Sequence, residues 1–162
     1  MVIIEFRKCI SNNNNNNNIL NNNNNLAGSE YVRRHDKALE ALAVQWAIDN
    51  GMLPSGTKWY RERWRWEKGK VIENNGKKLY WDWEHHIRTS CTAKRPHLTL
   101  EDNRKKEILL IDMACPNEFN RNGKREEKIR KYQQLCYELR ERRDRYKVKI
   151  IPVVIGCLGG GM

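Results

Sequence analysis

The chain has 162 residues, which is enough for one domain with a buried core but short for two. Its net charge of +11 makes a polyanion the first partner to consider, and a basic surface without a specific partner is the alternative. Five scattered cysteines without a CxxC pair argue against a zinc ribbon or a disulfide framework and favour reduced thiols inside a cell. No apolar run is long enough to span a membrane, so we expect no membrane partner.

The N-terminal segment, residues 1–28, is dominated by asparagine. Twelve asparagines between positions 12 and 25 are broken only by Ile19 and Leu20. Asparagine competes with its own backbone for hydrogen bonds and contributes little to a core. We therefore expect a disordered low-complexity segment. An inert expansion is the favoured interpretation, with self-association as the alternative.

Residues 29–76 are expected to form a helix and a connector. Ser29 is a good N-cap, apolar residues from Val32 to Trp46 recur at helical spacing, and Asn50-Gly51 ends the helix. The connector contains the run "KWYRERWRWEKGK", in which tryptophans alternate with basic residues. Such a run suits single-stranded nucleic acid, because bases stack on indoles between phosphate contacts. An edge strand whose indoles cover the core is the alternative.

Residues 77–158 are expected to form the main folded core, followed by a flexible tail at 159–162. Alternating and apolar runs predict strands near 77–83, 97–101, 107–114 and 148–155. Between the last two, an apolar stripe from Ile129 to Tyr146 predicts an amphipathic helix. The order helix–three strands–helix–strand predicts an α/β (α+β) fold with a mixed central sheet.

Asp112 lies in the apolar run from Ile108 to Ala114, where an unpaired carboxylate would be costly. If the strands at 97–101 and 107–114 form a hairpin with an even-numbered loop, Leu98 faces Ile111 and His97 faces Asp112. An odd-numbered loop would place Asp112 opposite Leu98 instead. Matching of the apolar residues favours the even loop.

The segment from Arg121 to Lys149 carries most of the positive charge. It holds twelve Lys or Arg and five Asp or Glu, which is +7 of the net +11. A helix that returns over the sheet would bring Lys124, Lys128 and Lys131 to the end of the Asp112 strand. Carboxylates, a divalent cation and an ammonium are what a metal-dependent phosphodiesterase needs. A salt bridge between Asp112 and one lysine explains the same residues without catalysis.

Six motifs carry a resemblance to a known family. In order, they are "SEYVRRHDKAL", "LYWDW", "AKRPH", "LLIDMACP", "REEKIRKYQQL" and "IPVVIGCLG". Together they resemble the C-terminal region of reverse transcriptase polyproteins from non-LTR retrotransposons, over about residues 29–158. That region carries a restriction-endonuclease-like domain of the PD-(D/E)xK type. The resemblance implies a domain that nicks DNA with Mg²⁺ or Mn²⁺, in the nucleus if it is functional.

The resemblance also implies roles for individual residues. Arg95 and Pro96 match the start of the family pattern, and Asp112 matches its second acid. The catalytic lysine is expected on the following helix, at Lys128 or at Lys131, and we favour Lys131 because it precedes Tyr132. The implied metal ligands are Asp112 and His97. The residues expected to contact DNA, or RNA, are Arg95, Lys124, Arg125, Lys128, Arg61, Arg63, Arg65 and Trp64.

His97 departs from the pattern, because the family has an aspartate at this position. Histidine is a poor ligand for Mg²⁺, which prefers oxygen. Three functions therefore stay open: a nicking endonuclease with an impaired site, a non-catalytic nucleic-acid-binding remnant, and a decayed copy without function. His35 is either a remnant of the family's upstream zinc knuckle or an ordinary histidine on a helix surface.

Overall fold

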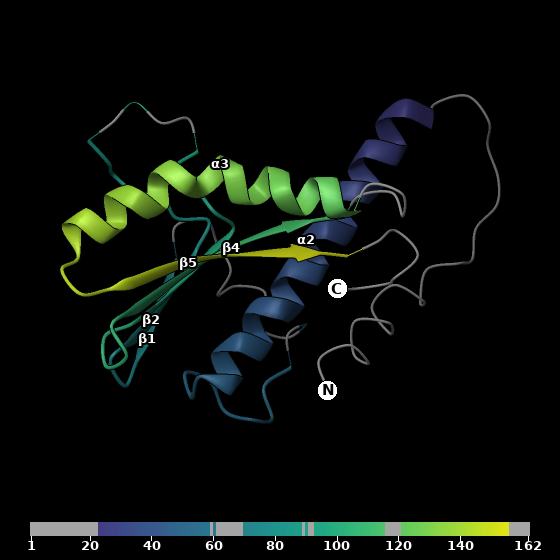
Figure 1. The fold of residues 1–162 in the computed structure, drawn as a ribbon. Helices are drawn as coiled ribbons and strands as arrows, with labels where there is room; N and C mark the ends of the chain where they lie inside the picture. The colour runs from purple at the N-terminus through teal and green to yellow at the C-terminus, as the bar shows by residue number, and fades with distance from the viewer. Residues whose placement is uncertain are drawn as a thin grey trace.

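The computed structural model describes residues 23–58, 60, 70–88, 90, 93–115 and 121–155, with only the backbone for 23–30 and 121. The elements in chain order are α2 (Asn23–Asp49), β1 (Val71–Asn74), β2 (Lys77–Trp81), β3 (Leu98–Asp102), β4 (Glu107–Ala114), α3 (Arg121–Arg142) and β5 (Lys147–Val154) (Figure 1). Within this part of the chain, no helix is both long and apolar enough to cross a membrane.

The five strands form one mixed sheet in the order β1-β2-β3-β4-β5. The first four strands are antiparallel to their neighbours, whereas β5 runs parallel to β4. A parallel pair needs a crossover, and α3 supplies it. The predicted α+β architecture with a mixed sheet is therefore confirmed.

The predicted number of strands was wrong, because β1 lies in what was expected to be a connector. Residues Asn75 and Gly76 link β1 to β2 with φ angles of 52° and 76°. Two successive positive φ values are typical of the two-residue hairpin turns that Asn-Gly favours. The dipeptide therefore signals a hairpin as well as a turn, and Val71–Asn74 is its first strand.

Two element boundaries also differ from the expectation. The first helix begins at Asn23 rather than at Ser29, so the last asparagines of the tract are helical. Asparagine inside a helix is only mildly unfavourable, and a helix held by packing further along can include it. Strand β2 ends at Trp81, because Asp82 has a φ of 46° that a strand does not accommodate. Strand β4 spans 107–114 as predicted.

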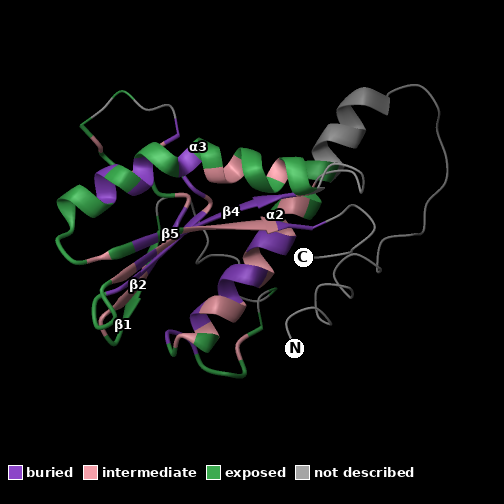
Figure 2. Ribbon diagram, in the orientation of Figure 1, coloured by how far each residue is buried: buried purple, intermediate pink, exposed green. Residues whose placement is uncertain are grey.

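The two helices cover opposite faces of the sheet (Figures 1 and 2). The apolar side of α2 packs on a face formed by alternate residues of the central strands, including Leu98, Leu100, Ile111 and Met113. On the other face, Ile108 and Leu110 pack against the buried stripe of α3. That stripe consists of Tyr132, Leu135, Cys136 and Leu139.

The register of β3 and β4 is the predicted one, with Leu98 opposite Ile111 and Leu100 opposite Leu109. Four residues, 103–106, form the turn, and Asp102 Oδ1 accepts hydrogen bonds from the amides of Arg104 and Lys105 at 3.0 and 2.9 Å. The even-numbered loop is confirmed. The face that carries Asp112 is not a polar surface, however, because Ile108 and Leu110 share it and α3 buries it.

Candidate functional site

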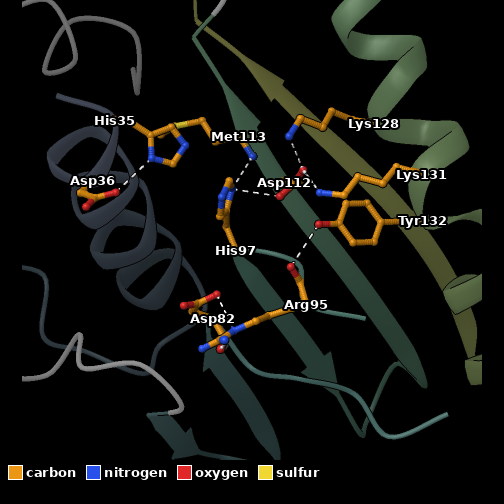
Figure 3. A network of polar contacts seen from close by, with 10 residues as sticks. All are labelled: His35, Asp36, Asp82, Arg95, His97, Asp112, Met113, Lys128, Lys131 and Tyr132. Atoms are coloured by element: carbon orange, nitrogen blue, oxygen red, sulfur yellow. Dashed lines mark hydrogen bonds and ion pairs between the residues drawn. The ribbon is translucent and has the colours of Figure 1, made fainter. Parts of the chain in front are cut away.

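Asp112 lies near the C-terminal end of β4, between the sheet and the first turns of α3 (Figure 3). Its side chain is only 2% exposed. Oδ1 lies 3.0 Å from Nδ1 of His97, and Oδ2 lies 2.7 Å from Nζ of Lys128. The lysine contact is an ion pair that lacks hydrogen-bond geometry, so Oδ2 is buried without a hydrogen-bond donor among the described residues. The sequence-based pairing of Asp112 with His97 is confirmed.

His97 Nδ1 lies close to one hydrogen-bond donor and one acceptor, and each requires a different protonation of this nitrogen. The amide of Met113 lies 2.9 Å away and donates to Nδ1 only when that nitrogen carries no proton. The Asp112 carboxylate lies 3.0 Å away and accepts from Nδ1 only when the nitrogen is protonated. The two hydrogen bonds are therefore mutually exclusive.

The surroundings of Asp112 keep it ionised. Burial alone would raise the pKa of the carboxyl group, but His97 and Lys128 outweigh burial and lower this pKa to about 2. The neighbouring Tyr132 hydroxyl donates to the carbonyl of Arg95 at 3.1 Å. Burial, followed by the charge of Asp112, raises the pKa of Tyr132. Both side chains therefore hold one charge state at neutral pH: a carboxylate and a neutral phenol.

The lysines of α3 reach Asp112 from one face of the helix. The Lys128 side chain is 15% exposed and lies closest, whereas the Lys131 side chain is 43% exposed and its ammonium lies 3.9 Å from Oδ2. Lys131 also lies 4.7 Å from the centre of the Tyr132 ring, over its face. Lys124 pairs with Glu127 at 2.6 Å. The expected approach of Lys128 and Lys131 to Asp112 is therefore observed, although Lys128 lies closer to Asp112 than the favoured Lys131.

The other residues expected to contact nucleic acid are more dispersed. Arg95 is paired with Asp82 (Figure 3). Its Nε lies 2.9 Å from Oδ1 of Asp82 and donates to the backbone carbonyl of Asp82 at 2.9 Å. Arg125 is exposed on α3. Most of the aromatic–basic run lies outside the described residues, and this applies to Arg61, Arg63, Trp64 and Arg65.

A cleft of about 370 Å³ opens beside Asp112, between the N-terminal halves of α2 and α3. The lining residues are Tyr31, Val32, His35, His97, Met113, Ala114, Cys115, Lys124, Glu127 and Lys128. Sequence reasoning did not place Tyr31 or Glu127 here. It left His35 open, and the structure sets the His35 ring edge-on to His97 with 4.8 Å between centroids.

The described residues do not fit a Mg²⁺ or Mn²⁺ ion held by protein groups alone. Both ions prefer several oxygen ligands, and no group of three or more His, Cys, Asp or Glu in this part of the chain could hold a metal. Neighbouring acids have other partners: Asp82 binds Arg95, and Glu127 binds Lys124. Glu101, further along that face, accepts from Tyr80 and pairs with Arg143. The positive charge beside Asp112 is instead supplied by Lys128.

Compared with known proteins, the chain matches no family model, no curated protein and no solved structure.

Proposed function

We propose that the chain is a nucleic-acid-binding domain with a restriction-endonuclease-like fold, related to the C-terminal region of non-LTR retrotransposon polyproteins. The observation that carries the proposal is the state of Asp112. Its charge is balanced by Lys128 at 2.7 Å, His97 Nδ1 lies 3.0 Å from it, and the described residues contain no group of three or more His, Cys, Asp or Glu that could hold a metal. The domain keeps the sheet, the crossover helix and the basic surface of a nuclease without its pair of acids.

The basic surface supports binding to a polyanion. Lys124, Arg125, Arg130 and Lys131 lie within the first three turns of α3, with Arg125 and Arg130 exposed. The surface ion pairs here are weak, since Arg130 and Glu126 are 72% and 73% exposed and 4.0 Å apart. Phosphates can replace such partners, and neutralising phosphates releases counterions.

Nucleic-acid binding by this helix is tested by replacing three of its basic residues at once. The variant Lys124→Ala/Arg125→Ala/Lys131→Ala should weaken binding to a fluorescent DNA about tenfold or more and make the slope of log K against log salt shallower by about 2 to 3. Fluorescence anisotropy between low and physiological salt measures both. The matched control, Arg104→Ala/Lys105→Ala/Lys147→Ala, removes three exposed charges at the opposite end of the sheet. Equal losses in the two variants, or binding that salt does not weaken, would contradict the proposal.

Metal-dependent nicking of DNA is the second candidate. It is favoured by the buried Oδ2 of Asp112, which has no hydrogen-bond donor among the described residues and lies next to Met113 and Lys128 of the cleft lining. A divalent cation at this oxygen would have to displace the Lys128 ammonium and take most of its remaining oxygen ligands from outside the described residues. Asp112-dependent cleavage of supercoiled plasmid DNA in the presence of Mg²⁺ or Mn²⁺ would favour this candidate over binding alone.

A further inference from the structure

We propose that the cleft between α2 and α3 binds the terminal phosphate of a nucleic-acid strand, with the first base stacked on Tyr31. This rests on the proposed function and adds to it a specific ligand, a nucleotide that ends in a phosphate. Its elements are lysines that line the cleft and an exposed aromatic ring among the lining residues.

The charges around the cleft favour an anion over a cation. Lys124 and Lys128 line it and Lys131 lies just behind, against the two carboxylates of Glu127 and Asp112. The balance is one positive charge. Two imidazoles, of His35 and His97, add ring nitrogens that can donate to a phosphate oxygen.

Lys124 is the lysine of the cleft that can most easily bind an incoming phosphate. It pairs with Glu127 at 2.6 Å, but the two side chains are 37% and 53% exposed, so the pair is weak in water. A terminal phosphate carries up to two charges, more than an internal phosphodiester, and competes for Lys124 with the single charge of Glu127. Lys128 remains paired with the buried Asp112 and attracts the phosphate through its electrostatic field.

Tyr31 offers the surface for a base. Its side chain is 47% exposed at the cleft, and its ring stacks on His35 with 6.4 Å between centroids and 26° between planes. Val32, which is 55% exposed, extends this apolar rim. Stacking of a base on an aromatic side chain is a common, sequence-tolerant contact in single-strand binding.

The lining and size of the cleft suit a single nucleotide. Residues of α2 and α3 line it, together with Met113 and Ala114 at the end of β4 and the following Cys115. Its volume of about 370 Å³ lies in the range of sites for small molecules.

The test compares oligonucleotides that differ only at one end, bound to the full chain and followed by anisotropy. Strands with a 5′-phosphate and with a 3′-phosphate are compared with the same strand ending in hydroxyl groups. We expect a phosphorylated end to bind about tenfold more tightly, as one strong charge-assisted contact allows. Lys124→Ala should abolish the preference, whereas Lys105→Ala, at the far end of the sheet, should keep it.

Two further variants make the assignment specific. Glu127→Gln removes the competing carboxylate and should strengthen binding of the phosphorylated end several-fold, whereas a cation site would lose a ligand. Tyr31→Ala should weaken that binding about tenfold. Tyr137→Ala, which removes an exposed tyrosine of α3 that is 58% exposed and does not line the cleft, should leave binding unchanged.

The outcomes separate this inference from the proposed function. Binding without an end preference would overturn the inference and leave the proposed function standing, whereas the absence of any binding would overturn both. Competition by a nucleoside monophosphate at concentrations near the Kd of the oligonucleotide would identify a free nucleotide as the source of the phosphate. Failure to compete at large excess would identify the strand end. An unchanged end preference in Lys124→Ala would also refute the assignment.

Discussion

Lys128→Met should lower the free energy of unfolding by about 3 kcal/mol, because it leaves a buried carboxylate without its nearest cation. Asp112 is 2% exposed, and after the substitution the Lys131 ammonium, 3.9 Å from Oδ2, would be its closest lysine among the described residues. Urea unfolding at neutral pH measures the loss. The control Lys124→Met removes a lysine that is 37% exposed and pairs at the surface, so it should change stability by less than about 1 kcal/mol.

In Lys128→Met, the free energy of unfolding should begin to fall at a higher pH than in the wild type. The pKa of Asp112 is lowered to about 2, below the value of about 3.9 expected in the unfolded chain, so its stabilising contribution is present above pH 4 and is lost as pH falls toward 2. That contribution is on the order of 2 to 3 kcal/mol. Without Lys128 the carboxyl pKa rises, and the loss begins at higher pH.

A double variant shows whether the ion pair itself is responsible. Asp112→Asn/Lys128→Met removes both charges, so its loss of stability should be smaller than the sum of the two single losses by about 2 kcal/mol. Strictly additive losses would mean that the two charges do not act on each other, and the electrostatic account of Asp112 would fail.

His97→Asp should destabilise the metal-free protein by about 3 kcal/mol, which corresponds to a fall in Tm of about 10 °C for a domain of this size. The substitution places a second carboxylate beside Asp112 and removes the acceptor of the Met113 amide. A pair of carboxylates is also a better site for Mn²⁺, so millimolar MnCl₂ should restore much of the loss. Thermal melts with and without the metal measure both effects.

His86→Asp is the matched control for this experiment. It introduces the same charge at an exposed position away from Asp112, so Mn²⁺ should not change its Tm. If Mn²⁺ stabilises the wild type as strongly as His97→Asp, the wild-type site already holds a metal. If it stabilises neither, position 97 is not the place of a missing acid.

Local patterns predicted the centre of the fold and the core of the site. Alternation of apolar residues gave the bounds of β4 and its register with β3, because only one register buries both sets of leucines and isoleucines. That register then set His97 beside Asp112. Helical spacing brought Lys128 and Lys131 to the same carboxylate once α3 crossed back over the sheet.

Features that depend on packing between distant segments could not be predicted in this way. Strand β1 is short, mostly exposed and at the sheet edge, so its residues carry no buried alternation. The contact of His35 with His97 depends on where α2 crosses the sheet, which no local pattern encodes. The burial of Asp112 under α3 has the same origin, since a hairpin alone would leave that face in water.

We propose that the domain binds nucleic acid while Asp112 serves as the buried half of an ion pair. Incubation of supercoiled plasmid with the wild type and with Asp112→Asn, in Mg²⁺ or Mn²⁺, tests it in one gel. We predict a mobility shift that salt reverses, with no nicked circles above background for either protein. Nicked circles that appear with the wild type, disappear with EDTA and are absent with Asp112→Asn would contradict the claim and establish a nuclease.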